Sequence, residues 1–365
     1  MIHDRRSFLQ TIGFGIAVSS IPAVARAGTR RDEKKLGIAL VGLGSYAKNQ
    51  LAVALEKTTN CYLAGIVTGT SEKAVEWSKK YNIPQKNIYN YQNFDQIATN
   101  KDIDIVYIVL PNSMHPEFVI RAARAGKHVM CEKPMANSVK EAEDMIRACR
   151  NANVQLGIGY RLHFEPFNQE VMRLGQKKIL GDVRFIQTNF GFNIGDPTQW
   201  RLKKEYAGGG PLMDVGIYCI QASRYTLGEE PLWVTAQFGP VTDKKVFTTV
   251  EESVSWQMQF PGGAMVNGFT SYRSNIEQLY VSATNGWVQL GPAYGYGPLK
   301  GKTSQGEMNL PVVHHQTLML QGICKSFIET GMFPAHISGE EGLRDTKILM
   351  AIYEAAQTGK KIPIH

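Results

Sequence analysis

The sequence has few cysteines, and its excess positive charge is not clustered. The five cysteines are odd in number and form no C-x-x-C pair, which argues against a disulfide scaffold and a structural zinc site. We expect them to be buried apolar side chains. The 40 Lys and Arg exceed the 32 Asp and Glu by eight, but without basic runs, so the clustered face typical of nucleic-acid binding is missing. His314 and His315 have no companion ligands at zinc-like spacing, and we expect no metal site.

The sequence also lacks an apolar run of membrane-spanning length. The apolar stretch over residues 11–24 is shorter than the ~20 residues that a transmembrane helix needs. It follows Arg5 and Arg6 and ends in Ala25-Arg26-Ala27, the layout of a bacterial signal peptide of the twin-arginine type. We predict a signal peptide over residues 1–27, cleavage after Ala27, export to the periplasm and no membrane attachment afterwards.

A glycine-rich turn follows the first apolar segment after this leader. Residues 36–41 are predicted to form a short strand and residues 47–55 a helix, with a G-x-G-x-x-A sequence joining them. Its first glycine permits the tight bend, its second lets the backbone approach a pyrophosphate, and the helix N-terminus supplies N–H donors. In this context the motif predicts a dinucleotide site, contacted by Gly42, Leu43, Gly44, Ser45 and Tyr46.

The end of the next strand indicates which dinucleotide binds. A site for NAD normally carries Asp or Glu there, to accept from the ribose 2′-hydroxyl. Residues 63–67 are instead followed by Thr68-Gly69-Thr70, so hydroxyl residues and no carboxylate occupy the strand end, and Lys73 follows shortly. Hydroxyl groups and an ammonium would stabilise a 2′-phosphate. We therefore expect NADP as the cofactor, with Thr68, Gly69 and Lys73 among its contacts.

The β–α alternation continues to about residue 157. Residues 103–110 and 128–131 are apolar along their length, as in the strands of a parallel sheet covered on both faces. We predict an α/β fold that begins with a doubly wound Rossmann domain over residues 28–157. Residues at the carboxyl ends of such strands face the ligand crevice, and here they are Asn112, His115, Glu132 and Lys133.

From about residue 158 the pattern changes to period two. Residues 185–190, 233–238, 254–260 and 264–269 alternate apolar and polar, which predicts an antiparallel sheet with one buried face. A helix beginning near Gly210 carries Asp214 and Tyr218 on one face, since they are four residues apart. We expect an α+β substrate-binding and oligomerisation domain over residues 158–365, with a large, mainly antiparallel sheet and a last helix that packs back on the core.

Lys133, Asp214 and Tyr218 are a candidate proton-transfer set. Oxidising a carbinol requires a base for the hydroxyl proton, and a free phenol holds its own proton too tightly for this role near neutral pH. A nearby ammonium stabilises the phenolate, so Lys133 would activate Tyr218, while Asp214 could orient Lys133 or a sugar hydroxyl. An ordinary core position for the Tyr218 ring is the alternative.

Together these residues resemble the Gfo/Idh/MocA oxidoreductase family, and most closely its branch of glucose–fructose and aldose–aldose oxidoreductases. The resemblance covers nearly the whole chain after residue 27. Many family members carry histidine at the position of Tyr218, and tyrosine there is typical of the sugar–sugar branch. The matching segments are the glycine-rich turn, Thr68-Gly69 with Lys73, and residues 88–91, 110–115, 131–136, 159–161, 200–202 and 208–218.

The resemblance implies a function and a set of contacts. It implies a periplasmic enzyme with tightly bound NADP that oxidises an aldose at C1 to the lactone and reduces a second sugar to an alditol. Lys133 and Tyr218 would transfer the proton. Tyr91 would join Lys73 at the adenine end of the cofactor, and family members form dimers or tetramers through the large sheet. The residues that would line the sugar pocket are Arg161, Trp200, Arg201 and Asp214. Further contacts to the cofactor would come from Arg161, Trp200, Arg201, Pro111, Asn112, His115, Glu132 and Lys133.

One departure leaves alternatives open. Glucose–fructose oxidoreductase carries a longer N-terminal arm that covers the cofactor, whereas here residues 28–35 alone separate the predicted cleavage site from the first strand. The chain could therefore be a sugar or cyclitol dehydrogenase with an exchangeable NAD(P), or an NAD-dependent glycosidase of the same family. A third possibility is a binding protein on this fold without catalytic activity.

Overall fold

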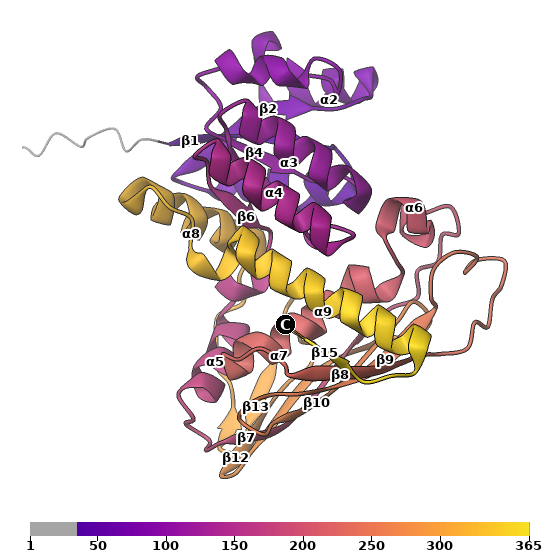
Figure 1. Ribbon diagram of the computed structural model, residues 1–365. Helices are drawn as coiled ribbons and strands as arrows, with labels where there is room; N and C mark the ends of the chain where they lie inside the picture. Colours follow the sequence, from indigo (N-terminus) through magenta and orange to yellow (C-terminus); the bar gives the residue numbers. More distant parts are fainter. Residues whose placement is uncertain (1–34, 365) are drawn as a thin grey trace, which may run out of the picture. The chain divides into compact units, whose positions relative to one another are not determined.

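A computed structural model describes residues 35–364; the predicted signal peptide lies outside them. Its first part is a six-stranded parallel sheet in the order β3-β2-β1-β4-β5-β6, flanked by helices, which confirms the predicted Rossmann domain (Figure 1). The strands are β1 (Leu36–Val41), β2 (Cys61–Val67), β3 (Ile88–Tyr89), β4 (Ile105–Ile108), β5 (His128–Cys131) and β6 (Leu156–Ile158). The helices are α1 (Ala52–Lys57), α2 (Ser71–Tyr81), α3 (His115–Arg124) and α4 (Val139–Asn151).

The second part is a nine-stranded sheet in the order β14-β13-β12-β11-β7-β10-β9-β8-β15. Each pair of neighbours is antiparallel except β7 and β10, so the predicted mainly antiparallel sheet is confirmed. The strands are β7 (Val183–Gly191), β8 (Trp233–Phe238), β9 (Ser253–Gln259), β10 (Met265–Ser271), β11 (Ile276–Ala283), β12 (Gly286–Leu290), β13 (Gly301–Thr303), β14 (Gly306–Glu307) and β15 (Ile362–Pro363). The helices are α5 (Pro166–Gln176), α6 (Lys204–Ala207), α7 (Ile217–Leu227), α8 (His315–Thr330) and α9 (Gly339–Thr358).

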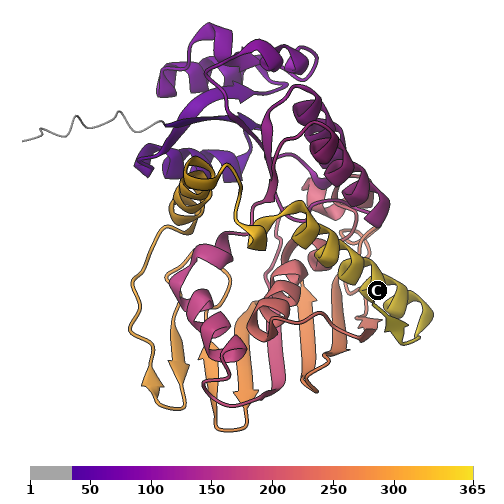
Figure 2. The same ribbon diagram turned by 60° about the vertical axis from the view of Figure 1, so that its left-hand side comes forward.

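The register of the large sheet separates an apolar face from a polar one. A buried row crosses six strands on the side covered by α7: Val234, Met258, Val266, Ile186, Val281 and Val288. The adjacent row, on the opposite face, is polar apart from one tyrosine: Thr235, Gln257, Asn267, Gln187, Tyr280 and Gln289. In Figure 2 the helices of the described chain that pack on this sheet lie against its apolar face. Alternation with period two therefore produced the one-sided burial that the sequence predicts.

The last two long helices return to the first sheet. α8 packs against α1, and α9 lies along α4 and reaches β8 of the large sheet (Figure 1). The predicted return of the last helix to the core is thus confirmed, and all five cysteines are buried and unpaired, as expected. Within residues 35–364, no helix combines the length and the apolar character that a bilayer crossing requires.

A buried charged network fastens α9 to α7. The Asp345 carboxylate accepts from Arg224 (2.7 Å), Gln221 (2.8 Å) and the Tyr160 hydroxyl (2.6 Å). Asp345 is 0% exposed, so these donors replace the water that a carboxylate normally binds. The network therefore fixes α9 in place as long as the carboxylate is present.

Replacing Asp345 with alanine should lower the free energy of unfolding by about 3 kcal/mol, because the buried donors of Gln221 and Tyr160 and one nitrogen of Arg224 lose their acceptor, although Arg224 keeps Glu230 and Glu341. Denaturant unfolding measures the change. Asp182→Ala is the control, since the Asp182 side chain is 47% exposed in its ion pairs and surface pairs contribute about 0–1 kcal/mol. Equal effects of the two substitutions would contradict this prediction.

Candidate active site

A cavity of about 700 Å³ is lined by residues from both sheets and their connections. Its size is within the range of small-molecule and cofactor sites. Seventeen of the nineteen predicted site residues line it: Gly42, Leu43, Gly44, Ser45, Tyr46, Thr68, Lys73, Tyr91, Pro111, Asn112, Glu132, Lys133, Arg161, Trp200, Arg201, Asp214 and Tyr218. The structure thus brings residues more than 170 positions apart into one place.

Two predicted residues, His115 and Gly69, do not line the cavity. The His115 ring is fully buried, with its nitrogens 3.0 Å from the Pro134 carbonyl oxygen and 2.9 Å from that of Leu110. The ring therefore links the chain segments of Leu110 and Pro134. The prediction placed His115 in the crevice because it follows a strand end, but such a position does not determine where a side chain points. A Cβ on Gly69 would lie 2.9 Å from the Tyr91 ring, so this glycine instead allows Tyr91 to form part of the wall.

Gly42 and Gly44, in the turn after β1, have different structural roles. Gly42 has φ +93°, and a Cβ there would lie 2.6 Å from the Val109 carbonyl oxygen, so the fold requires glycine. A Cβ on Gly44 would meet no atom within 4 Å, although Gly44 lines the cavity. The space beside Gly44 is therefore open, and it fits a pyrophosphate group close to the backbone.

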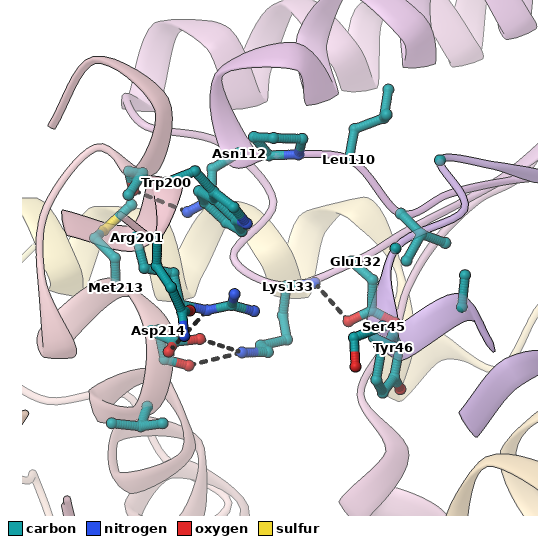
Figure 3. A pocket seen from close by; sticks show the side chains of 18 of the residues that line it. Ser45, Tyr46, Leu110, Asn112, Glu132, Lys133, Trp200, Arg201, Met213 and Asp214 are labelled. Carbon is teal, nitrogen blue, oxygen red and sulfur yellow. Dashed lines mark hydrogen bonds and ion pairs between the residues drawn. The ribbon is translucent and has the colours of Figure 1, made fainter. Parts of the chain in front are cut away.

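The cavity wall near the end of β2 carries hydroxyl groups and one ammonium. Thr68, Thr70, Lys73 and Tyr91 contribute to it. The acidic residues among the described lining residues are Glu132 and Asp214, which are placed at Lys133 rather than at β2 (Figure 3). This composition fits the adenosine end of a dinucleotide.

Lys133 and Asp214 form the centre of the site. The Lys133 ammonium donates to the Asp214 main-chain oxygen at 2.6 Å and lies 3.5 Å from its carboxylate Oδ1. Figure 3 shows the Lys133 side chain reaching toward Asp214, while Glu132 lies on the other side, near Ser45 and Tyr46. The prediction that Asp214 orients Lys133 agrees with this geometry.

Two further groups hold the other oxygen of Asp214. Its Oδ2 lies 3.1 Å from Arg201 Nε and accepts a hydrogen bond of 3.1 Å from the Tyr272 hydroxyl. Burial alone would raise the pKa of Asp214, but Arg201 and Lys133 outweigh it and lower the pKa below its usual range. The carboxylate is therefore ionised at neutral pH. Tyr272, at the end of β10, has no motif in the sequence that would have identified it.

Two cations lie near the ring of Tyr218. The Lys133 ammonium is 4.8 Å from the centroid of the Tyr218 ring, and the Arg161 guanidinium carbon is 5.0 Å from it. Asp214 occupies a π-helical turn, Leu212–Gly216, and Tyr218 the first turn of α7. The predicted proximity of Lys133 and Tyr218 is present, but Arg161 is as close to the phenol ring as Lys133.

Arg161 is 2% exposed and anchors a loop of the second part. Its Nη1 donates to the Gly295 oxygen at 3.0 Å and lies 2.8 Å from His315 Nδ1; its Nη2 donates to the Tyr294 oxygen. Burial and the Arg161 charge lower the pKa of His315 to about 3, so its neutral ring can accept this bond. His315, which we considered above only as a metal ligand, thus supports the site. The Arg161 Nε is buried and has no partner in the described chain, which leaves a donor for a ligand.

Glu251 supports the segment that leads to Asp214. Its carboxylate accepts from the backbone N–H groups of Gly210 (2.9 Å) and Leu212 (3.2 Å), and from the Tyr353 hydroxyl of α9 (2.9 Å). The first N–H groups of a helix lack partners within the helix, and a carboxylate satisfies them. No motif identifies Glu251 in the sequence, because it precedes β9 and lies about forty residues from the segment that it holds.

Comparison with known proteins accounts for this arrangement. Residues 36–160 match the model of the oxidoreductase family with an NAD-binding Rossmann fold, and residues 168–289 match the GFO/IDH/MocA C-terminal domain. The chain belongs to the Gfo/Idh/MocA oxidoreductase family. Membership in this family agrees with the open space beside Gly44, where the chain's residues fit an NAD(P) dinucleotide.

Several relatives in the family are similar over most of the chain. The crystal structure of aldose–aldose oxidoreductase from Caulobacter crescentus, complexed with glycerol, has 41% identity and a TM-score of 0.87, and covers 91% of this chain and 100% of that chain. D-xylose 1-dehydrogenase [NADP(+)] of Haloarcula marismortui is 29% identical over 88% of this chain and 91% of its own length. Trans-1,2-dihydrobenzene-1,2-diol dehydrogenase of Xenopus tropicalis is 30% identical over 66% of this chain and 71% of its own.

The open space beside Gly44 yields a test of the dinucleotide site. Gly44→Ala should leave the melting temperature of the cofactor-free protein unchanged, because a Cβ there meets no protein atom within 4 Å. It should weaken dinucleotide binding by about tenfold or more, since the methyl group takes up space at the pyrophosphate. Isothermal titration calorimetry measures the affinity. Unchanged affinity would show that no pyrophosphate lies against Gly44.

Proposed function

We propose that this protein is a periplasmic sugar–sugar oxidoreductase that retains NADP. It oxidises an aldose at C1 to the lactone and then reduces a second sugar, an aldose or a ketose, to an alditol. The observation that carries this proposal is the placement of Tyr218, Lys133 and Asp214 on the wall of the same cavity as the glycine-rich turn. The 41% identity to an aldose–aldose oxidoreductase over that enzyme's whole chain supports it.

In this proposal Tyr218 moves the proton. A bound nicotinamide supplies the hydride acceptor for the first sugar and the hydride donor for the second. The Tyr218 phenolate takes the proton of the C1 hydroxyl as the C1–H bond breaks, and the sugar leaves as the lactone. When the second sugar is reduced, the Tyr218 hydroxyl returns that proton to the new alkoxide. Lys133 and Arg161, each within 5.0 Å of the ring centroid, place two positive charges near the phenolate that begins the first half-reaction and is restored by the second.

Trp200, Arg201 and Asp214 form the sugar side of the cavity in this proposal. The Arg201 guanidinium carbon lies 4.6 Å from the centroid of the Trp200 ring, and Arg201 also pairs with Asp214. These contacts fix the indole, whose apolar face can cover the C–H groups of a sugar while the charged groups bind its hydroxyls. Asp214 already orients Lys133, so one carboxylate would align both substrate and proton-transfer group.

The preference for NADP rests on the wall near β2. Hydroxyl groups of Thr68 and Thr70 and the ammonium of Lys73 can bind a 2′-phosphate, and the lining residues there include no carboxylate to repel it. A relative in the family, D-xylose 1-dehydrogenase of Haloarcula marismortui, carries NADP(+) in its name.

The retained cofactor gives a direct test with sugars. Purified protein, desalted and without added cofactor, should gain absorbance at the band of reduced nicotinamide when an aldose is added, and a second sugar should remove that absorbance. A dehydrogenase with an exchangeable cofactor shows the change only when NADP is supplied. Absence of any change in both conditions would overturn the proposal.

Tyr218→Phe should lower kcat by about a hundredfold or more, because removing a general acid–base group costs on the order of 10²–10⁴ in rate. Sugar and cofactor affinity should change little, since the ring and its two cations remain. Single-turnover reduction of the bound cofactor measures the rate. Tyr62→Phe, on a residue that is 41% exposed and outside the cavity, is the control. Turnover above about a tenth of wild type would exclude Tyr218 as the proton-transfer group.

We further propose a homodimer or homotetramer that uses the polar face of the large sheet. The row of paired residues from Thr235 to Gln289 carries no charge across six strands, and the Tyr280 ring stacks on Trp287 at 6.1 Å. Interface centres are depleted in charged residues and enriched in aromatic ones, which this face matches. Export by the twin-arginine route rests on the sequence of residues 1–27 alone.

Native mass spectrometry of protein purified from the periplasm tests these points together. We expect an even number of subunits, each with one NADP and an N-terminus at Gly28. The same sample, denatured, identifies the nucleotide by mass. A monomer would contradict the sheet interface, and NAD would contradict the role of Lys73. Absence of the protein from the periplasmic fraction, with residues 1–27 retained on the chain in the cytoplasmic fraction, would contradict export.

A further inference from the structure

Two tyrosines from distant parts of the chain face each other at the cavity. Tyr46 belongs to the glycine-rich turn after β1, and Tyr296 belongs to the loop between β12 and β13. Their ring centroids are 6.1 Å apart, with 30° between the ring planes, which is an offset-stacked pair. Tyr296 is 55% exposed, so the pair lies where the cavity opens to solvent.

The loop that carries Tyr296 is held from two sides. Arg161 donates to the main-chain oxygens of Tyr294 and Gly295, and its guanidinium carbon lies 4.8 Å from the centroid of the Tyr296 ring. The Glu277 carboxylate accepts from the N–H groups of Tyr294 and Gly295, both at 2.6 Å. An exposed aromatic ring on such a fixed loop costs little entropy to place, so a ligand contact with it is preorganised.

The stacked pair lies at the reactive end of the cavity. Tyr46 and Glu132 both line this end of the cavity, and burial and then the Glu132 charge raise the pKa of Tyr46 well above its usual range. In Figure 3 Tyr46 lies beside Glu132, next to Lys133. Tyr46 is also two residues from Gly44, where the pyrophosphate fits. A dinucleotide that reaches from Gly44 to Lys133 therefore passes the Tyr46 side chain.

We propose that Tyr46 and Tyr296 form an aromatic clasp that closes over the nicotinamide half of the cofactor and slows its release. This inference rests on the proposed function, in which the protein retains its cofactor. It assigns the retention to two residues of the folded domains rather than to an N-terminal arm. It makes Tyr296 a cofactor-retaining residue. The rings must separate before the cofactor leaves, and Arg161 and Glu277 hold one of them in position.

A double-mutant cycle on the holoenzyme tests the clasp. The rate of NADPH release from Tyr46→Leu, Tyr296→Leu and the double variant is followed by the loss of nucleotide fluorescence in stopped flow, with excess NADP present to prevent rebinding. Each single variant should release the nucleotide about 3- to 10-fold faster than wild type, the range expected for one aromatic pair. The double variant should be no more than about twofold faster than the faster single variant, because both substitutions remove the same contact.

Tyr62→Leu, on an exposed tyrosine outside the cavity, should release NADPH at the wild-type rate. Equal melting temperatures of the cofactor-free proteins show that the variants are folded. Wild-type release rates in both single variants, or fully additive effects in the double variant, overturn the clasp. Rapid release of NADPH from the wild-type protein would instead contradict the proposed function, in which the cofactor is retained. The double-mutant cycle, measured in stopped flow, would in that case still decide whether the two rings act together.

Discussion

One largely buried carboxylate, that of Asp214, holds the candidate active site together. It contacts Lys133, which follows β5 of the first sheet, Arg201 from the connection before α6, and Tyr272, which follows β10. A buried charge is costly unless partners replace its hydration, and the two cations need Asp214 for the same reason. The three segments therefore meet where their charges compensate each other. The position of Lys133 over the Tyr218 ring is a consequence of this arrangement.

Much of the fold was predictable because local patterns determine it. The buried strand over residues 36–41, the glycine-rich turn and the alternation around residue 186 each depend on neighbours within a few positions, and the structure has them where the sequence predicts. Most of the site was predictable for a related reason: strand ends of a doubly wound sheet meet at one crevice. The helix near Gly210 also occurs as predicted, although its first turn is π-helical.

The remaining part of the site depends on contacts that no local pattern encodes. Tyr272, Glu251, Tyr296 and His315 lie in loops or at element ends, where neither spacing nor periodicity distinguishes them from solvent-facing residues. Each acts through a partner far along the chain, such as His315 through Arg161 at 2.8 Å. His115 shows the opposite error, because its place after a strand pointed to the crevice while its ring nitrogens lie within 3.0 Å of two main-chain carbonyl oxygens inside the protein.

The return of α8 and α9 to the first sheet has a consequence for biosynthesis. The ribosome completes the cofactor-binding sheet by residue 158, but α1 and α4 find their covering helices only when residues 315–358 emerge. Nearly the whole chain must be synthesised before α8 and α9 can pack on that domain. The domain that contains the glycine-rich turn is therefore completely folded only at the end of translation. Long-range pairing of this kind slows folding and favours acquisition of the nucleotide after synthesis rather than during it.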